Sequence, residues 1–433
     1  MSFVDHVDLT AIAGRVGTPF YIYSAEVLRQ RIADVRAIAP GGVLQARYAM
    51  KACSLRRTLE VVRDAGIWID AVSGNEVLRA SAAGFPTGHA PPAVLLTADV
   101  FRDNALDVVL EHGILPNIGS PAMIDALRRT GYRGPIGVRV NPGFGHGHVQ
   151  ETDTGGPSSK HGIWHEDLDA IRDAAHAAGY PIVLLHAHIG SGPQIDEFNA
   201  NMSHLERFFL ERIADFPDLE AVNVGGGIPH AYRPDRPSID LAPLGRILHA
   251  AQQHLSARAG RTLRVEIEPG RYIVAPTAAL VARVTDIKTT CTNEKGPGNT
   301  FVMIDAGFVD LVRPAMYGAY HHITVHPAGA GAAEPHRSDD TLVPLVVAGP
   351  LCESGDVFTR DAAELLDPRR LPMPRIGDLL VLHDVGAYGV QMSSNYNSIG
   401  RAPQVWIEDR RAYLASRRET LEDIVRAECF EPL

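Results

Sequence analysis

Short apolar runs of strand length alternate with amphipathic helical patterns between residues 45 and 270. Patterns such as SLRRTLEVVRDAG and SPAMIDALRRTG separate the runs. Near-continuous apolar strands that alternate with helices are typical of a parallel sheet covered by helices on both faces. Eight such units predict a TIM-like (β/α)8 barrel, with an open doubly wound sheet as the alternative. The eight runs are ARYAMKA, IWIDAVS, AVLLTAD, ILPNIGS, PIGVRVNPG, IVLLHAHIG, LEAVNVGGG and LRVEIEPG.

The pattern of apolar and polar residues changes after the eighth run. Strand-like segments there are separated by turns, without helical patterns between them. These segments, from LVARVTDIKTT to APQVWIED, predict a mainly antiparallel β domain. The stretch TPFYIYS at 18–24 is also strand-like, and we expect it to join that sheet. We therefore predict a β domain formed by residues 1–37 and 283–433, and a cofactor-binding barrel formed by residues 38–282. A surface loop is expected at 326–340.

The composition favours a globular protein that acts on a small molecule. Of the 433 residues, 45% are hydrophobic and 21% are charged, and the net charge of −10 disfavours nucleic acid as a partner. No run approaches the roughly 20 apolar residues of a membrane span, and the start MSFVDHVDLT lacks a signal-peptide pattern. Four cysteines do not form a disulfide framework, so we expect a cytoplasmic protein.

One lysine stands at the end of a strand, in RYAMKAC. The chain has 41 basic residues, of which only Lys51, Lys160, Lys288 and Lys295 are lysines. An ammonium group can lose its proton and act as a nucleophile, whereas a guanidinium group cannot. Lys51 is therefore the candidate nucleophile, either as the Schiff-base lysine of an aldolase or as the residue that holds pyridoxal 5'-phosphate.

Residues at the other strand ends discriminate between these two uses, because barrel active sites lie at the C-terminal ends of the strands. The glycines of NVGGGIP offer backbone N–H groups to a phosphate. His188 can stack on a planar ring, and Glu268 can bond a pyridine nitrogen and keep it protonated. An aldolase needs neither ring partner, so the combination favours pyridoxal phosphate. The strand-end residues are Lys51, Ser73, Asp99, Asn117, Asn141, His188, Ser191, Gly225, Gly226, Gly227 and residues 268–271.

Each of these features has a simpler interpretation when it stands alone. A GGG run is usually an ordinary loop, and a single strand-end histidine usually makes a structural hydrogen bond. The histidines of GHGH at 145–148 and of the pair at 321–322 lack the carboxylate or thiol spacing of a metal site, so no metal is expected. His186 is expected to point away from His188.

Longer motifs resemble those of fold-type III pyridoxal-phosphate decarboxylases. YAMKAC, HIGSG, VGGG, EPGR, DAGF, RPAMYG, GPLCESGD and GAYG occur in the order of that family. Within it, RVNPGFGHGHVQETDTGGPSSKHGIW and GAYGVQMSSNYNS resemble the diaminopimelate decarboxylases, and the resemblance covers nearly the whole chain. It implies an alanine-racemase-like barrel with a β domain, pyridoxal phosphate as the cofactor, and a homodimer with shared active sites.

The resemblance also assigns roles to residues. Lys51 would carry the cofactor, and Cys352 would protonate the product of decarboxylation. Cys352 and Glu353 would come from the partner subunit. The implied cofactor-binding residues are Lys51, His188, Ser191, Gly227, Glu268, Gly270, Arg271 and Tyr388. The implied substrate-binding residues are Arg271, Arg313, Tyr317, Glu353 and Tyr388, with Arg271, Arg313 and Tyr317 on the distal carboxylate.

Two positions depart from the most common pattern. Related enzymes often read S-x-G-E after the second strand, whereas VSGNE places the glycine at 74. Because Glu76 is kept, we expect a local difference in the backbone there. His161 of SSKHGI stands where many relatives have phenylalanine, a variation that the lysine-pathway branch tolerates.

The implied reaction is decarboxylation of meso-2,6-diaminopimelate to L-lysine and carbon dioxide, the last step of bacterial lysine biosynthesis, through a Schiff base of the substrate with the cofactor. A decarboxylase of ornithine, lysine or arginine is the nearest alternative, but these substrates offer no distal carboxylate to Arg271 and Arg313. A racemase usually has an arginine where Glu268 stands. A non-catalytic pyridoxal-phosphate-binding protein has no use for Cys352 or for a substrate clamp.

Overall fold

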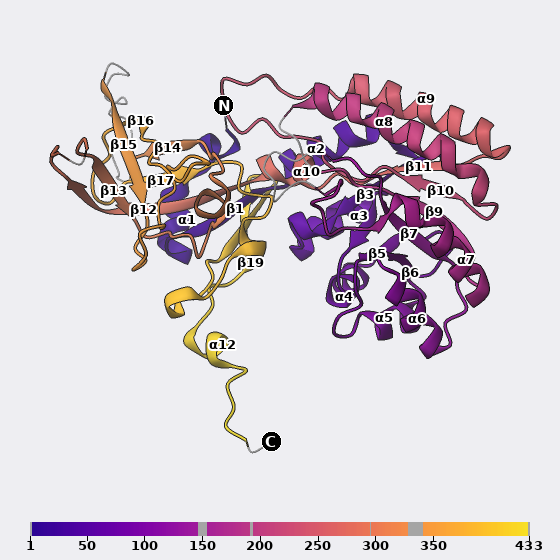
Figure 1. Ribbon diagram of the computed structural model, residues 1–433. Helices are drawn as coiled ribbons and strands as arrows, with labels where there is room; N and C mark the ends of the chain where they lie inside the picture. Colours follow the sequence, from indigo (N-terminus) through magenta and orange to yellow (C-terminus); the bar gives the residue numbers. More distant parts are fainter. Residues whose placement is uncertain (1, 146–153, 191–193, 295, 328–340, 432–433) are drawn as a thin grey trace. The chain divides into compact units, whose positions relative to one another are not determined.

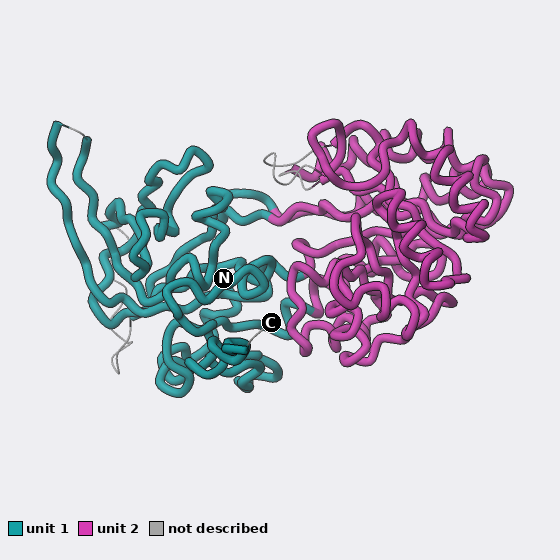
Figure 2. Tube along the Cα trace, turned by 60° about the horizontal axis from the view of Figure 1, so that its bottom comes forward, with its two compact units in different colours: residues 1–28, 231–237, 274–433 teal, residues 29–230, 238–273 magenta. Residues whose placement is uncertain are grey.

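The computed structural model describes residues 2–145, 154–190, 194–294, 296–327 and 341–431 (Figure 1). The chain forms two compact units, coloured separately in Figure 2. The barrel unit comprises Arg29–His230 and Ser238–Ile273, and the β unit comprises Met1–Leu28, Ala231–Pro237 and Val274–Leu433. Each unit has its own sheet and is described by itself.

Eight parallel strands form the barrel, as predicted, and the last pairs with the first. Strand β11 lies beside β3 with Val265 opposite Leu44, so the sheet is closed and the open doubly wound alternative is wrong. Strands β5 and β9 are each buried at four of their five residues, which explains their near-continuous apolar runs. In order around the barrel the strands are β3 (Leu44–Ala49), β4 (Trp68–Ala71), β5 (Val94–Ala98), β6 (Leu115–Ile118), β7 (Ile136–Asn141), β9 (Ile182–His186), β10 (Ala221–Asn223) and β11 (Arg264–Ile267).

Amphipathic helices cover the outside of these strands, and α8 and α9 lie side by side (Figure 1). Helix α3 buries Leu59 and Val62 while its charged residues face away, as a helical apolar stripe requires. The helices are α2 (Ala25–Ile38), which begins in the β unit, α3 (Arg56–Asp64), α4 (Gly74–Ala82), α5 (Ala105–His112), α6 (Pro121–Thr130), α7 (Leu168–Ala178), α8 (Ile195–Arg212), α9 (Ala242–Ala259) and the short α10 (Arg271–Val274). Two-residue strands β2 (Pro40–Gly41) and β8 (Ile163–Trp164) extend the sheet.

The β unit is built around a mainly antiparallel sheet, as predicted, in the order β16-β15-β13-β12-β1-β18-β19, with β14 and β17 paired beside β12. The central strand β1 is fully buried and pairs antiparallel with β12 and parallel with β18. The strands are β1 (Phe20–Ser24), β12 (Ala278–Thr289), β13 (Thr300–Ile304), β14 (Ile323–His326), β15 (Leu342–Ala348), β16 (Arg369–Pro372), β17 (Leu379–Leu382), β18 (Gln404–Glu408) and β19 (Arg411–Ser416). The predicted domain limits at 37/38 and 282/283 stay a prediction.

Helix α1 (Leu9–Val16) closes one face of this sheet. Its Leu9 and Ile12 pack in one buried cluster with Phe20, Val281 and Val405. The other helices of the β unit, α11 (Arg313–Tyr317) and α12 (Leu421–Val425), are five residues each. Of the surface loop expected at 326–340, residues 328–340 lie outside the described residues.

Three strands of the β unit have no counterpart among the predicted runs. Strand β19 is exposed along almost its whole length, so no alternation of buried and exposed positions marks it. Strands β14 and β16 are four residues each and only partly buried. Within the described ranges, no helix has both the length and the apolar character that crossing a membrane requires.

Candidate active site

Lys51 stands on a tight turn directly after β3. The turn is a 3-10 helix, η2 (Met50–Ala52), in which Met50 and Ala52 are buried while Lys51 is exposed at the C-terminal end of the strand. The backbone N–H of Ala49 donates to the carbonyl of Pro269 at 3.3 Å, so the turn is tied to the sequence that follows β11. A side chain on Gly270 would begin 3.2 Å from the Cβ of Ala49. The structure thus brings the RYAMKAC and EPGR motifs together.

Glu268, just past the end of β11, is buried and held by two side chains. The amide of Asn223 donates to its Oε1 at 2.7 Å, and Nε2 of His186 lies 3.4 Å from its Oε2. Burial raises the pKa of this carboxyl. The electrostatic interaction with His186, followed by those with His188 and Lys51, outweighs burial, so the pKa of Glu268 lies well below its usual value. Glu268 is therefore a carboxylate.

His186 faces the same centre as His188, and the expectation that it points away is wrong. Strand β9 ends at His186, and both His186 and His188 act on the pKa of Glu268, so both histidines lie near this carboxyl at the barrel mouth. The Asn117 amide donates to Nδ1 of His186 at 2.7 Å, which leaves the ring proton on Nε2, the atom nearest Glu268. His186 and Asn223 both contact Glu268, and the sequence did not predict this role for either residue.

The ring of His188 is neutral. Its Nδ1 accepts a hydrogen bond from the backbone N–H of Gly226 at 3.2 Å, which requires an unprotonated nitrogen. Burial, followed by the ammonium of Lys51, lowers the pKa of His188 well below its usual value. A neutral, fixed imidazole at this position is suited to stack on a planar ring.

The glycine run after β10 has no room for side chains. A Cβ on Gly225 would lie 2.7 Å from the Cβ of His188, and one on Gly226 would lie 2.3 Å from the carbonyl oxygen of Glu268. A Cβ on Gly227, whose φ is +117°, would lie 2.3 Å from the carbonyl oxygen of Gly190. The ends of β9, β10 and β11 therefore meet through bare backbone, the arrangement that a phosphate cradle needs. Ser191, predicted to join this cradle, lies outside the described residues.

Two acids beside Lys51 complete the barrel part of the site. Burial, followed by the charge of Glu268, raises the pKa of Asp70 well above its usual value, while Lys51 opposes this rise. Burial also raises the pKa of Glu76, again opposed by Lys51. The sequence analysis noted Glu76 but missed Asp70, whose signal was an acid inside the apolar run IWIDAVS. The ammonium of Lys51 thus lies close enough to Asp70 and Glu76 to lower their pKa values.

Gly74, the departure from the family pattern, is explained by close packing of helices. It is the first residue of α4, and a Cβ there would lie 2.4 Å from the side-chain oxygen of Asn104 at the start of α5. Glu76 accepts the backbone N–H of Val72 at 2.8 Å and stabilises the turn after β4. Gly74 is thus needed where the starts of α4 and α5 approach each other, and the expected local difference in the backbone stays a prediction.

His161 connects its loop to the end of β5. Its Nδ1 lies 2.7 Å from Oδ2 of Asp99, whose Oδ1 accepts the backbone N–H of Gly162 at 3.1 Å. Burial raises the pKa of Asp99, but the bond from His161 and that from Gly162 outweigh burial and leave the pKa below its usual value. A phenylalanine at 161 could not make this hydrogen bond to Asp99, so the bond explains why a histidine suits this position.

In the β unit, Arg313 and Tyr317 belong to one helical turn. They are the first and last residues of α11, and positions i and i+4 lie on the same face of a helix. Arg313 is buried and Tyr317 is partly buried. Nη1 of Arg313 lies 3.2 Å from the hydroxyl of Tyr232 and 3.1 Å from Nε2 of His321. The predicted carboxylate-binding pair therefore has a shared direction.

Cys352 and Glu353 are presented outward by a loop that is ordered around Asp356. Oδ1 of this buried carboxylate accepts the N–H of Phe308 at 2.7 Å, and Oδ2 accepts that of Leu351 at 2.8 Å. Burial raises the pKa of Asp356. Cys352 and Glu353 themselves are exposed. The loop thus displays a thiol and a carboxyl on the surface of the β unit.

Tyr388 has an unusual backbone conformation. Its φ is +60°, in the left-handed region that non-glycine residues seldom adopt. The glycines on either side are tightly packed, since a Cβ on Gly386 would lie 1.9 Å from the carbonyl oxygen of Val274, and one on Gly389 would lie 2.3 Å from that of Val385. Such constrained conformations are often found at functional sites.

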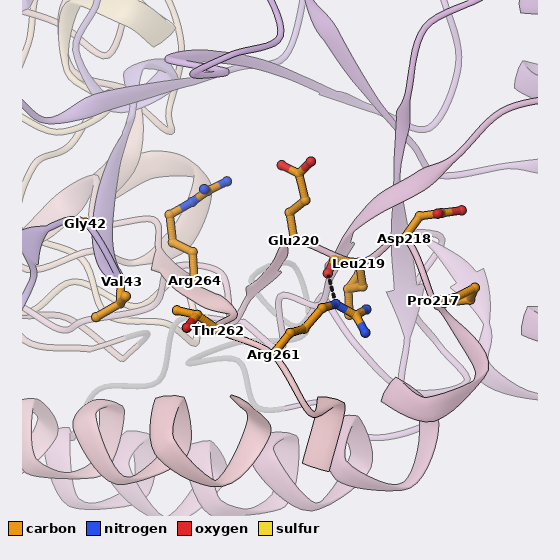
Figure 3. Close-up of a pocket in the computed structure, with 9 residues that line it drawn as sticks. All are labelled: Gly42, Val43, Pro217, Asp218, Leu219, Glu220, Arg261, Thr262 and Arg264. Carbon is orange, nitrogen blue, oxygen red and sulfur yellow. Dashed lines mark hydrogen bonds between the residues drawn. The ribbon is translucent and has the colours of Figure 1, made fainter. Parts of the chain in front are cut away.

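A separate hollow of about 440 Å³ is lined by the residues drawn in Figure 3. Its walls come from residues that precede β3, β10 and β11, such as Val43, Glu220 and Thr262, whereas Lys51 and Glu268 follow β3 and β11. It is therefore not part of the predicted site. Among the described side chains, no group of three or more metal-binding residues is arranged to hold an ion.

Comparisons with known proteins agree with these motifs. A family model described as pyridoxal-dependent decarboxylase, pyridoxal binding domain, matches residues 26–275. The chain is 39% identical to the diaminopimelate decarboxylase of Escherichia coli (strain K12) over 435 residues, which cover 98% of each chain. A crystal structure of diaminopimelate decarboxylase has a TM-score of 0.87 at 38% identity, with 96% of this chain and 95% of that chain covered. The diaminopimelate decarboxylase from Helicobacter pylori complexed with L-lysine has a TM-score of 0.82 at 27% identity, with 96% and 98% covered.

Proposed function

The chain belongs to the diaminopimelate decarboxylase family of pyridoxal-dependent decarboxylases, and we propose that it converts meso-2,6-diaminopimelate to L-lysine and carbon dioxide, the last step of bacterial lysine biosynthesis. The observation that carries this proposal is the ionised Glu268 carboxylate beside a neutral His188 at the mouth of a barrel whose strand-end lysine is Lys51. This combination serves a protonated pyridine ring and has no purpose in a Schiff-base aldolase.

The residues of the barrel mouth fit pyridoxal phosphate. The carboxylate of Glu268 suits a pyridinium N–H, the neutral imidazole of His188 suits a ring face, and the bare backbone at Gly227 suits a phosphate. We assign Gly270, Arg271 and Ser191 to the same phosphate and ring contacts. When bound, the cofactor accepts into its ring the electron pair that the departing carboxylate leaves behind.

Lys51 would hold the cofactor covalently through its amine. An amine attacks only when it is unprotonated, and the acids around Lys51 give its proton a destination. Asp70 and Glu76 have raised pKa values and respond to the charge of Lys51. We assign both tasks to Lys51, binding the cofactor and releasing it to the substrate amine.

We assign the substrate contacts to the residues that the family resemblance implies. Arg271, Arg313 and Tyr317 would bind the distal carboxylate, because charge-assisted guanidinium–carboxylate bonds fix both position and orientation. Glu353 would bind the distal amino group, and Tyr388 would contact substrate and cofactor. Cys352 would then donate its thiol proton to the carbon that lost carbon dioxide, a positioned proton transfer worth about 10²–10⁴ in rate.

Cys352 and Glu353 would act on the site of a partner subunit in a homodimer. Their exposure on an ordered loop supports this arrangement, since a thiol and a carboxyl that serve a neighbouring chain must be accessible on their own. We also expect the protein in the cytoplasm. Its four cysteines, Cys53, Cys291, Cys352 and Cys429, form no disulfide in the described part of the chain, which is consistent with a reducing compartment.

Release of carbon dioxide from meso-diaminopimelate, compared with L-lysine, L-ornithine and L-arginine, tests the proposed function. A site that pairs charged groups rejects analogues that lack them, so we expect kcat/KM for the meso substrate to exceed the others by about 10⁴. The L,L isomer should also react poorly, because Glu353 and the arginines read the configuration of the distal carbon. Comparable kcat/KM values for ornithine or lysine would contradict the proposal.

A further inference from the structure

The hydrogen bonds of His321 fix its tautomer. The side chain is buried in the β unit, with Nδ1 2.9 Å from the carbonyl oxygen of His383 and Nε2 3.1 Å from Nη1 of Arg313. A carbonyl oxygen can only accept a hydrogen bond, and a guanidinium can only donate one. Nδ1 therefore carries the proton and Nε2 accepts from Arg313, so the imidazole is neutral.

We propose that His321 is a positioning residue that holds Arg313 in the orientation needed to bind the distal carboxylate of the substrate. This inference rests on the proposed function. Imidazole Nε2 sets one direction of the planar guanidinium, and the backbone carbonyl of His383 sets the plane of the imidazole. His321 would thus influence specificity without touching the substrate.

Tyr232 supports the same arrangement from a second side. Its hydroxyl lies 3.2 Å from Nη1 of Arg313, and its ring centroid lies 5.1 Å from the guanidinium carbon. The Tyr232 and His321 rings meet edge to face, with 5.5 Å between their centroids. Tyr232 and His321 are both uncharged, so they orient the guanidinium without neutralising it. A guanidinium with a fixed direction is suited to bind a carboxylate through paired charge-assisted hydrogen bonds.

Two substitutions separate the two hydrogen bonds of His321. In His321→Gln, the longer side chain can place an amide oxygen near the position of Nε2 and accept from Arg313. In His321→Asn, the shorter side chain can place an amide N–H near the position of Nδ1 and donate to His383, but it leaves Arg313 without this acceptor. Only the second variant should loosen the clamp.

We expect His321→Asn to raise KM for meso-diaminopimelate by about 10- to 100-fold, the range for one hydrogen bond to a charged group. Its kcat should change less than about threefold, because a contact made equally in ground and transition states affects KM alone. His321→Gln should retain KM within about threefold of wild type. The matched control is His6→Gln, which alters an exposed histidine of the β unit; its KM should not change.

Cofactor absorbance and thermal unfolding of each full-length variant show whether it is folded and loaded. Equal KM values for the Gln and Asn variants, or an unchanged KM in His321→Asn, would overturn the inference while leaving the proposed function intact. A fall in kcat with KM unchanged would also overturn it. A wild-type protein that releases no carbon dioxide from meso-diaminopimelate would overturn both.

Discussion

His186 directs its Nε2–H toward the carboxylate of Glu268, with 3.4 Å between Nε2 and Oε2. Asn117 fixes the orientation of the His186 ring, because its amide donates a hydrogen bond to Nδ1 of that ring. The same amide also donates to the hydroxyl of Thr97. That hydroxyl donates in turn to the buried Asp70 at 2.6 Å. A chain of hydrogen bonds thus leads from Asp70 through Thr97 and Asn117 to His186, whose Nε2 lies beside the group that would bond the pyridine nitrogen.

His186→Leu should therefore weaken the cofactor's ability to accept electrons. Without His186, burial of Glu268 is less well opposed, so the pKa of the carboxyl rises and its hold on a protonated pyridine weakens. We expect kcat to fall about tenfold, the effect of about 1.4 kcal/mol on the activation barrier. A pH titration of the bound cofactor's absorbance should shift as well.

Glu268→Gln should lower kcat more than His186→Leu does, while cofactor binding is approximately retained. The control is His176→Gln, which alters an exposed histidine on α7 and should change neither kcat nor cofactor binding. Unchanged kcat in both the His186 and the Glu268 variants would assign the carboxylate another task.

Lys51 should be the residue that binds the cofactor. Borohydride reduction of the loaded protein is expected to fix a pyridoxyl label on the peptide that contains residues 47–56, because the reagent reduces a lysine–cofactor Schiff base. Lys51→Ala should bind cofactor without this label and lose nearly all turnover, since an amine is needed at that position. Peptide mapping that finds the label on Lys160 or Lys288 would refute the assignment.

Gly226→Ala should lower cofactor affinity. The added Cβ would lie 2.3 Å from the carbonyl oxygen of Glu268, so the ends of β10 and β11 must separate and carry the phosphate cradle with them. We expect the dissociation constant of pyridoxal phosphate to rise at least about tenfold, measured by absorbance, since each 1.4 kcal/mol corresponds to that factor.

The matched control is Gly14→Ala in α1, where an added Cβ has no neighbour within 4 Å. It should leave cofactor affinity unchanged and stabilise the helix by about 0.5–1 kcal/mol. Retained affinity in Gly226→Ala would mean that the glycine run is required for packing alone.

Mixed dimers should reveal whether Cys352 acts on the partner's site. Lys51→Ala and Cys352→Ala are each expected to be inactive, so the two variants are mixed, dissociated and reassociated. If the sites are shared, random pairing of a twofold-symmetric dimer restores one intact site in each mixed dimer and about a quarter of wild-type activity. Activity that stays at background would place both residues in the site of one chain.

His383 should make the β unit less stable at acid pH. Burial, with a smaller effect of His322, lowers the pKa of His383 from 6.5 to about 4, although Asp384 and Asp5 oppose this. The unfolded chain therefore binds a proton in a pH range where the folded protein does not, so the free energy of unfolding falls as the pH drops from about 6.5 to about 4. The full effect is about 3 kcal/mol, since one pKa unit corresponds to 1.36 kcal/mol.

His383→Gln should flatten this pH dependence, because glutamine does not titrate. Urea unfolding of the full chain across the same pH range measures the difference. His6→Gln, which alters an exposed histidine of the same unit, should leave the pH dependence as in wild type. An identical acid slope in His383→Gln and wild type would show that other groups dominate acid unfolding.

The local sequence determined the elements and the chemistry of this protein. Apolar runs bounded by turns predicted all eight barrel strands, since strands buried on both faces, such as β5 and β9, are mostly apolar. Parallel topology then placed Lys51, His188 and Glu268 at one end of the barrel, because the C-terminal ends of parallel strands share an edge. The scarcity of lysine singled out Lys51 before any contact was known.

Tertiary structure alone decided which groups support these residues. His186 and Asn117 are 69 positions apart, and His321 and His383 are 62 apart, so their hydrogen bonds leave no local pattern in the sequence. The need for glycine at 74 likewise comes from Asn104 on the next helix. Secondary structure follows from neighbours along the chain, whereas pKa values, tautomers and fixed side-chain directions follow from neighbours in space. For that reason the sequence predicted the groups of the site, while the fold determined their protonation and orientation.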